Sequence, residues 1–268
     1  MSKNALTLGT WNVNSLRVRL PHLEQWLATS PVNVLGLQET KIVDADFPAA
    51  DVERLGLAGG WHGQRTYNGV ALLAKEPVLD LVRGIPGYDD EQARVIAGTV
   101  RGVRIIDVYV PNGQAVGSDK YAYKLAWLER LRDYLAAEMA QHPLLAVVGD
   151  YNIAPTDADV HDPKAWEGQV LVSEAERGAL GALQQLGLID VFRRFEQAER
   201  SYSWWDYRAG ALRRNAGLRI DLILASSALA EHCTGCWVDV EPRRWERPSD
   251  HAPVVATFDL TADEPIRT

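Results

Sequence analysis

An Asp and an Asn, one residue apart, follow an apolar run in the middle of the chain. The run is Val147-Val148-Gly149, and it stops at Asp150-Tyr151-Asn152. Such a run is typical of a buried strand, and the glycine allows a tight turn where the run ends. We therefore expect Asp150 and Asn152 to be held on rigid backbone at the rim of a sheet, where catalytic groups are often placed.

Other polar side chains occupy the same kind of position, inside or at the end of an apolar run. The set contains carboxylates, amides, one tyrosine and one histidine: Asn12, Glu39, Tyr109, Asp150, Asn152, Asp221, Asp250 and His251. If the strands share a layered sheet, these side chains can converge on one edge. The set offers no suitable Ser or Cys nucleophile, and oxygen-rich sites suit Mg²⁺ or Mn²⁺ rather than zinc.

Such a set is suited to the hydrolysis of a phosphate ester. A carboxylate-held Mg²⁺ would neutralise phosphate charge, a second carboxylate would activate water, and amide or histidine donors would stabilise the pentacovalent state. Asp250 precedes His251 directly. A carboxylate beside a histidine can fix its tautomer and favour its charged form, so we expect Asp250 to orient His251.

The elements that must position these residues alternate between strand and helix. Residues 6–11 and 34–38 are expected to be strands, and leucines at helical spacing predict a helix over 16–27 between them. This order indicates an α/β or mixed layered fold. Further strands are expected at 70–74, 95–100, 103–110, 144–148, 219–224, 237–240 and 254–258, and further helices over 125–135 and 173–186. Residues 44–60 and 152–168 are expected to be irregular.

Composition and length are those of an ordinary globular protein. The 268 residues are 47% hydrophobic and 24% charged. With no Pro/Gly/Ser-rich linker, we expect one domain over residues 1–268, with its core at about 6–260. No run is long enough to span a membrane and the start does not resemble a signal peptide, so a cytoplasmic, monomeric protein with no membrane partner is the default expectation.

Net charge and cysteine content bear on which kinds of binding protein or metal site the chain could be. A net charge of −8 disfavours a general nucleic-acid coat protein, but not an enzyme on nucleic acid, because a bound cation restores positive charge locally. Cys233 and Cys236 form a Cys-x-x-Cys pair, which can be a redox pair or half of a zinc site. No second Cys pair exists to complete a zinc site, so we interpret both as packing residues.

Four motifs together resemble the exonuclease III branch of the endonuclease/exonuclease/phosphatase superfamily. They are Leu37-Gln38-Glu39-Thr40-Lys41, Gly149-Asp150-Tyr151-Asn152, Gly217-Leu218-Arg219-Ile220-Asp221 and Ser249-Asp250-His251-Ala252-Pro253. Thr10-Trp11-Asn12-Val13-Asn14 comes first and Tyr109-Val110-Pro111-Asn112-Gly113 lies in the middle, as this family requires. The resemblance extends over residues 6–260. It implies a four-layered α/β sandwich, with two packed mixed β-sheets flanked by helices.

The resemblance also implies a metal site. Glu39 would be the principal Mg²⁺ ligand, with Asn12 and Asp250 close to it. Asp150 and Asn152 could hold a second metal ion. His251 belongs to the same candidate site, and Mn²⁺ is an alternative ion. Whether one or two ions act stays open.

Catalytic roles follow from the same resemblance. Asp150 would activate or position the attacking water, and Asn152 would stabilise the transition state. Tyr109 would lie by the scissile phosphate, and His251 would bind a phosphate oxygen. Asp221 would tune the site or assist the leaving group.

The flanks of the motifs indicate DNA as the substrate. Trp204 and Trp205 resemble the aromatic segment of DNA-repair members, where rings wall an abasic-sugar pocket or wedge beside a base; packing in the core is the alternative. The other expected DNA contacts are Arg213, Arg214, Asn112 and His161, to which Lys120 and Lys124 could add phosphate contacts. A bulky His161 near the pocket could obstruct a flipped abasic residue and favour end-processing over internal incision.

We therefore expect a Mg²⁺-dependent DNA-repair nuclease acting on double-stranded DNA. It would incise at abasic sites, digest recessed 3′ ends as a 3′→5′ exonuclease, or do both. It would also trim blocked 3′ ends. A small-molecule or lipid phosphoesterase of the same superfamily and a catalytically inactive DNA-binding module are the alternatives. The absence of a hydrophobic membrane-binding insert disfavours the first, and the filled catalytic positions disfavour the second.

Overall fold

Two six-stranded sheets form the centre of the protein. The computed structural model describes residues 5–260, and within them the first sheet has the order β11-β12-β1-β2-β4-β3. Its strands are β1 (Ala5–Asn12), β2 (Val34–Gln38), β3 (Ala58–His62), β4 (Val70–Ala74), β11 (Cys233–Val238) and β12 (Val254–Asp259). Only β1 and β2 run parallel in this sheet, so the sheet is mixed.

The second sheet has the order β5-β6-β7-β8-β10-β9. Its strands are β5 (Leu79–Arg83), β6 (Val95–Val100), β7 (Val103–Tyr109), β8 (Leu145–Asp150), β9 (Leu188–Asp190) and β10 (Asp221–Ser226). Here β7 and β8 are the parallel pair and the other neighbours are antiparallel. The parallel connection from β7 to β8 passes through a long helix, as a parallel crossover requires.

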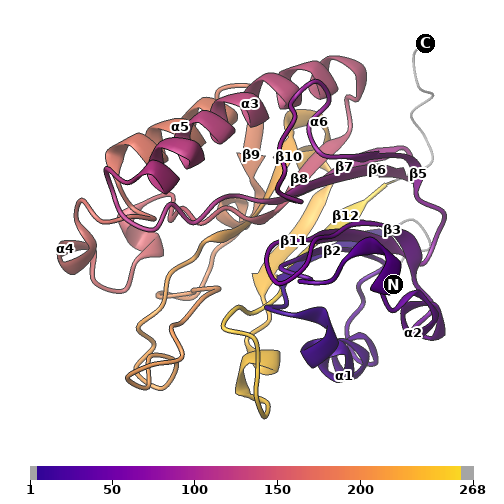
Figure 1. Cartoon of the computed structure of the whole chain (residues 1–268), viewed down its shortest axis with the longest axis horizontal. Helices are drawn as coiled ribbons and strands as arrows, with labels where there is room; N and C mark the ends of the chain where they lie inside the picture. The colour runs from indigo at the N-terminus through magenta and orange to yellow at the C-terminus, as the bar shows by residue number, and fades with distance from the viewer. Residues whose placement is uncertain (1–4, 261–268) are drawn as a thin grey trace.

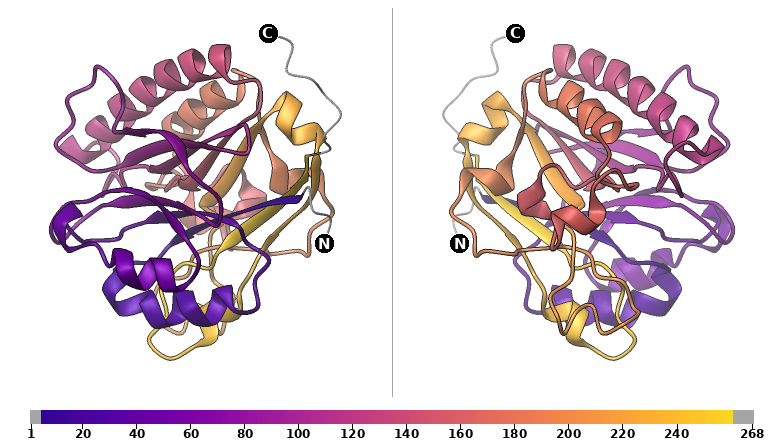
Figure 2. Two further views of the ribbon diagram at one scale, coloured as in Figure 1. Left: turned by 90° about the vertical axis from the view of Figure 1, so that its right-hand side faces the viewer. Right: turned by 90° about the vertical axis from the view of Figure 1, so that its left-hand side faces the viewer.

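Helices cover the outer face of each sheet, as Figures 1 and 2 show. The first sheet carries α1 (Leu16–Leu27) and α2 (Ala49–Arg54), and the second carries α3 (Asp119–Gln141) and α5 (Glu174–Gln184). Shorter helical segments are α4 (Pro163–Trp166), α6 (Ser227–Glu231), η1 (Asp44–Asp46), η2 (Asp157–Asp159), η3 (Val191–Arg194) and η4 (Glu241–Arg244). The predicted four-layered α/β sandwich is confirmed.

The main core lies between the two sheets. On β7, Val103 and Ile105 face this inter-sheet core, whereas Ile106 and Val108 face the layer under α3. This alternation is the period of two that a strand imposes on its side chains. Cys233 and Cys236 are free, buried and part of the inter-sheet core, in agreement with their interpretation as packing residues.

The expectation that residues 44–60 are irregular is wrong. They contain η1, α2 and the start of β3. The strand has no apolar alternation because Gly59 and Gly60 occupy its centre, and a side chain at Gly59 would meet the Leu72 carbonyl at 2.1 Å. Close approach to β4, rather than a hydrophobic pattern, defines this edge strand.

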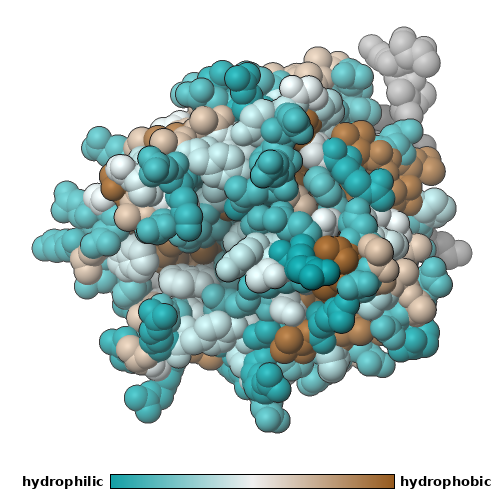
Figure 3. Space-filling model, in the orientation of Figure 1, coloured by the Kyte–Doolittle hydropathy of each residue, from teal (hydrophilic) through white to brown (hydrophobic). Residues whose placement is uncertain are grey.

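Other boundaries also differ from expectation. β5 and the three-residue β9 lie in segments for which no strand was expected, and β11 begins at Cys233 rather than at residue 237, with an irregularity between Cys233 and Gly235. The loop 152–168 contains η2 and α4. Among the described residues, no helix is long and apolar enough to cross a membrane. The face of the molecule shown in Figure 3 is mostly hydrophilic.

Candidate active site

Strand ends bring the predicted polar residues together. β1 ends at Asn12, β2 ends one residue before Glu39, β7 ends at Tyr109 and β8 ends at Asp150, where β10 begins with Asp221. The register pairs Asp150 with Tyr109 on one side and with Asp221 on the other. Because neighbouring strands lie about 4.8 Å apart, this register alone places these residues in adjacent positions at one edge.

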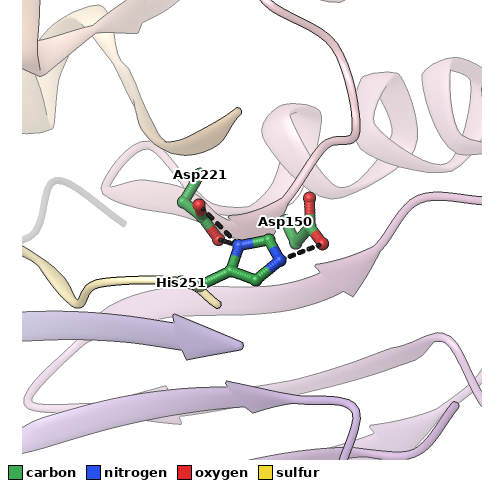
Figure 4. A group of neighbouring side chains, drawn as sticks. All are labelled: Asp150, Asp221 and His251. Atoms are coloured by element: carbon green, nitrogen blue, oxygen red, sulfur yellow. Dashed lines mark hydrogen bonds and ion pairs between the residues drawn. The ribbon is translucent and has the colours of Figure 1, made fainter. Parts of the chain in front are cut away.

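His251 lies between two carboxylates, as Figure 4 shows. Its Nδ1 is 2.9 Å from Asp221 Oδ2, and its Nε2 is 3.7 Å from Asp150 Oδ2. The backbone N–H of His251 donates to Ser249 Oγ, and its carbonyl accepts from the indole of Trp11 at 3.1 Å. The ring is therefore fixed at both ends, and it is 4% exposed.

The charges around His251 determine its protonation. Burial alone would lower the pKa of His251, but Asp221 and Asp150 outweigh burial and raise that pKa to about 10. Burial raises the pKa of Asp150 to about 7, although the His251 charge opposes the change. The site thus holds a protonated imidazole beside a carboxyl that can change its protonation near neutral pH.

The expectation that Asp250 orients His251 is wrong, because Asp221 does so. The Asp250 carboxylate instead accepts from Asn14 Nδ2 at 2.9 Å and from Trp204 Nε1 at 3.0 Å. Burial tends to raise the pKa of Asp250, but the His251 charge and these two donors lower it overall. Side chains of adjacent residues at the entrance to β12 diverge, so adjacency in sequence did not mean pairing.

Asn12 connects the two halves of the site. Its amide nitrogen donates to Glu39 Oε1 and to Asp150 Oδ2, both at 2.9 Å. Glu39 Oε2 also lies 2.9 Å from Lys41 Nζ. Asn12 comes from the first sheet and Asp150 from the second, so one buried amide fixes the two carboxylates relative to each other.

Tyr109 completes the row of groups on the second sheet. Burial raises the pKa of its hydroxyl well above the usual value, and the charges of Glu39 and Asp150 raise that pKa further. The Arg94 guanidinium lies 4.8 Å from the Tyr109 ring and donates to the Tyr109 carbonyl. The phenol therefore stays protonated and can act only as a hydrogen-bond donor toward an anion.

Asn152 is held by its neighbours in a left-handed conformation, with φ of 49°. Its backbone N–H donates to Asp150 Oδ1 at 2.9 Å, and its amide nitrogen donates to the Val110 carbonyl at 3.0 Å. Its amide oxygen accepts from Asn112 Nδ2 at 3.1 Å. Asp150, Asn152 and Asn112 thus form one hydrogen-bonded group at the ends of β7 and β8.

Lys124 lies beneath this group, so the expectation that it contacts phosphate is wrong. Its side chain is fully buried, and Nζ donates to the carbonyls of Asn152 at 2.7 Å and Asn112 at 3.2 Å. It also pairs with the equally buried carboxylate of Glu176. A helical position that sequence suggests is exposed was buried by the packing of α3 against α5.

The expected DNA contacts divide into three groups. Trp204 is half-buried at the site, where its backbone pairs with His251. Trp205 is 2% exposed and its indole donates to Asn215, so its expected contact with DNA is wrong and the alternative, core packing, holds. Exposed side chains remain at Asn112, Arg213 and Arg214, and His161 is half-buried.

Sequence reasoning did not single out Asn14, Lys41 or Ser203. Asn14 and Lys41 lie two residues beyond Asn12 and Glu39, and Lys41 Nζ donates to Asn14 Oδ1 at 2.6 Å. Their spacing within the quoted motifs was a usable signal. Ser203 donates to Asp221 Oδ2 at 2.6 Å. It directly precedes Trp204, but the sequence does not show this contact because it depends on tertiary structure.

Comparison with known proteins agrees with this geometry. The profile of the Endonuclease/Exonuclease/phosphatase family matches residues 9–251. Exodeoxyribonuclease III of Haemophilus influenzae is 35% identical over 262 residues, which cover 93% of this chain and 98% of that protein. The family profile spans every residue of the site, from Asn12 to His251.

Solved structures are also similar over the whole described fold. The 3′-5′ exonuclease NExo of Neisseria meningitidis is 46% identical, with a TM-score of 0.93 over 95% of this chain and 100% of that chain. The same protein from Neisseria has been solved as a 3′ phosphatase bound to a product DNA hairpin. An AP endonuclease from Archaeoglobus fulgidus is 39% identical, with a TM-score of 0.91 over 95% of this chain and 100% of that chain.

Motifs, fold and site geometry therefore agree with one another and with these relatives. The chain belongs to the endonuclease/exonuclease/phosphatase family, in its exonuclease III and AP endonuclease branch, and is a phosphodiester-hydrolysing DNA-repair nuclease.

Proposed function

We propose that this nuclease acts mainly on the 3′ ends of duplex DNA, as a 3′→5′ exonuclease that also trims blocked 3′ ends, and that it incises internal abasic sites less readily. The observation that carries the proposal is the position of His161. Trp204 pairs by backbone bridges with both His251 and Leu218, and Leu218 pairs with Val160. Three bridges therefore connect the catalytic histidine to Val160, the residue directly before His161.

The His161 ring is held in place rather than free to move aside. Its Nδ1 lies 3.2 Å from the Gly217 carbonyl, and its ring meets Trp166 edge-on at a centroid distance of 6.3 Å. An abasic sugar flipped out of a duplex needs room beside the scissile phosphate. A fixed imidazole on a segment that is bridged to Trp204 through Leu218 reduces that room, whereas a terminal nucleotide needs no flipping.

The oxygen-rich residues fit a divalent cation such as Mg²⁺. Glu39, Asn12 and Asp250 supply carboxylate and amide oxygens, which hard cations prefer. Atoms of Asp150, Asp221 and His251 also lie within 4.8 Å of one another. In that second group both imidazole nitrogens face carboxylates and the ring is protonated, so it offers a proton rather than a lone pair.

We therefore place the principal cation on Glu39, with Asn12 and Asp250 beside it. When bound, Mg²⁺ would neutralise phosphate charge and polarise the phosphoryl group. Mn²⁺ has the same ligand preference and should substitute for it. Asp150 and Asn152 are oxygen donors that could take part in holding a second ion.

Side chains of the protein carry out the proton transfer and stabilise the developing charge. Asp150, whose pKa is about 7, accepts a proton from the attacking water. Asn152 and the Tyr109 hydroxyl donate hydrogen bonds to the oxygens on which charge develops. The protonated His251 binds a non-bridging phosphate oxygen and keeps its proton because Asp221 faces its other nitrogen.

The test uses two labelled duplexes, one with an internal abasic analogue and one intact with a recessed 3′ end. Each is incubated with Mg²⁺ or EDTA, with wild-type protein, His161→Gly and His142→Gly. His142 lies at the far end of α3 and serves as the matched control. We expect Mg²⁺-dependent digestion from the 3′ end by all three, and a higher ratio of incision to digestion in His161→Gly alone.

Three results would contradict the proposal. An unchanged ratio in His161→Gly would mean that this ring does not limit access to the pocket. Efficient incision by the wild-type protein would make it an abasic-site endonuclease in spite of His161. Cleavage of neither duplex would favour a small-molecule phosphoesterase.

A further inference from the structure

A carboxyl group lies between the two sheets, outside the described site. Asp107 follows Val103 and Ile105 on the face of β7 that packs against the first sheet, and its side chain is completely buried. On the facing strand β2, a side chain at Gly36 would meet the Asp107 carboxyl at 2.9 Å. The glycine therefore makes room for the carboxyl group within an otherwise apolar core.

The Asp107 carboxyl binds a side chain from the opposite sheet. Gln38 Nε2 donates to Asp107 Oδ1 at 2.5 Å and to Thr10 Oγ1 at 2.9 Å. Gln38 is the last residue of β2, directly before Glu39, and Asp107 precedes Tyr109 by two residues on β7. One hydrogen bond thus connects the two strands that deliver Glu39 and Tyr109 to the site.

Two oxygen atoms of this pair have no partner within residues 5–260. They are Gln38 Oε1 and Asp107 Oδ2, both of which are buried. A proton on Asp107 would give the Gln38 amide oxygen a donor, so that acid and amide bond reciprocally. Burial raises the pKa of Asp107 well above its usual value, which favours this neutral form. An ionised carboxylate here would be a buried charge without a counter-charge, which is costly.

Glu39 needs such support because its backbone is strained. It has a φ of 51°, in the left-handed region that non-glycine residues seldom adopt. Its carbonyl accepts from the Ser15 N–H at 2.8 Å, so the segment beyond it is fixed. The Gln38 side chain fixes the segment before it. A change in the position of Gln38 would therefore move the Glu39 carboxylate relative to Asp150 and Tyr109.

We propose that Asp107 is a positioning residue for the metal-binding carboxylate of Glu39 and acts through Gln38. This inference rests on the proposed role of Glu39 as a cation ligand. Asp107 touches neither substrate nor cation. It supplies a directional bond between the two sheets further inside the core than the Asn12–Asp150 bond at the strand ends.

The test measures Mn²⁺ binding to DNA-free protein by electron paramagnetic resonance, beside the Mg²⁺ dependence of exonuclease activity. Asp107→Leu keeps a similar volume but breaks the link, whereas Asp107→Asn can still donate to and accept from Gln38. Ile105→Val is the matched control, because Ile105 lies on the same face of β7 and loses only packing. Glu39→Gln is the reference for loss of the ligand.

We expect Asp107→Leu to weaken Mn²⁺ binding by roughly 10-fold or more, in the range found when groups that orient a metal ligand are removed. Asp107→Asn and Ile105→Val should bind Mn²⁺ as the wild type does. If Asp107→Leu does not fold, Gln38→Met breaks the same link from the other strand and should weaken binding similarly.

Suppose that Asp107→Leu, or Gln38→Met in its place, folds and binds Mn²⁺ as the wild type does, while Glu39→Gln binds more weakly. That result would overturn the role of Asp107 but leave the proposed ligand role of Glu39 intact. Wild-type affinity in Glu39→Gln would overturn the proposed ligand role of Glu39, and the inference with it. Equal weakening in Asp107→Leu, Asp107→Asn and Ile105→Val would show a general packing effect and would also overturn the inference.

Discussion

Asp107→Asn should be more stable than the wild type by an amount that grows as the pH rises, because the wild type loses stability that the variant does not. In the folded protein burial holds the pKa of Asp107 well above 3.8, and the Gln38 amide with the backbone groups of Ala71 and Leu37 only partly opposes this. In the unfolded chain the carboxyl loses its proton above about pH 4. Between these two pKa values the unfolded state binds fewer protons than the folded state, so wild-type stability falls as pH rises.

The size of this effect follows from linkage. One proton per molecule changes the free energy of unfolding by about 1.4 kcal/mol per pH unit. Each pH unit between 5 and 7 over which the folded protein keeps the Asp107 proton and the unfolded chain does not should therefore lower wild-type stability by that amount, up to about 2.7 kcal/mol in total. The Asn side chain has no proton to lose, so Asp107→Asn lacks this contribution at every pH.

Urea denaturation of both proteins at several pH values between 5 and 7 provides the assay. Other groups that titrate in this range, such as Asp150 and His251, are common to both proteins and cancel in the difference. We expect the difference in free energy of unfolding to grow in favour of Asp107→Asn. Asp133→Asn, an exposed change on α3, should show a constant difference from the wild type.

A constant difference between the wild type and Asp107→Asn would refute the reasoning. It would mean that Asp107 is already ionised in the folded protein at pH 5. The reciprocal bond with Gln38 would then be absent, and the unpartnered Gln38 oxygen would need another donor.

Three further predictions concern the site and its support. Asp150→Asn should reduce turnover by roughly 100- to 10,000-fold, as loss of a general base does, while fluorescence anisotropy shows retained DNA binding; near wild-type turnover would remove Asp150 from the mechanism. Asp221→Asn should lower the pKa of His251 by roughly 1 to 3 pH units, measured by NMR, because the carboxylate nearest to Nδ1 loses its charge. Lys124→Met should cost about 3–5 kcal/mol in urea denaturation because it leaves a buried carboxylate without its cation, and Glu176→Gln in the same chain should recover part of that loss.

Strand ends were the part of the site that the sequence predicted well. The apolar runs before Asn12, Glu39, Tyr109 and Asp150 each end where the structure ends a strand or within two residues of it. A buried strand needs apolar residues on both faces, so its end is marked by the first polar side chain. The same rule predicted the strand that carries Asp221 to within two residues of its observed start.

Partner choice within the site was not predictable, because it depends on register and packing. Adjacency suggested that Asp250 orients His251, whereas the antiparallel register of β8 and β10 brings Asp221 to that ring. Trp205 shows the same limit, since its neighbour Trp204 reaches the site while Trp205 packs in the core. Alternation along an extended segment gives adjacent residues opposite surroundings, but does not say which one faces the site.

The location of the site across two sheets explains why a polar pair belongs in the core. Apolar contacts are non-directional, so packing between two sheets resists separation more strongly than small sliding along the strands. Catalysis tolerates little sliding, because groups must be held within about 0.5 Å of their working positions. Asn12 fixes Glu39 and Asp150 relative to each other at the strand ends, and the Gln38–Asp107 bond connects β2 with β7 from within the core. A directional bond at each level defines the relative position of the two sheets where apolar packing alone would not.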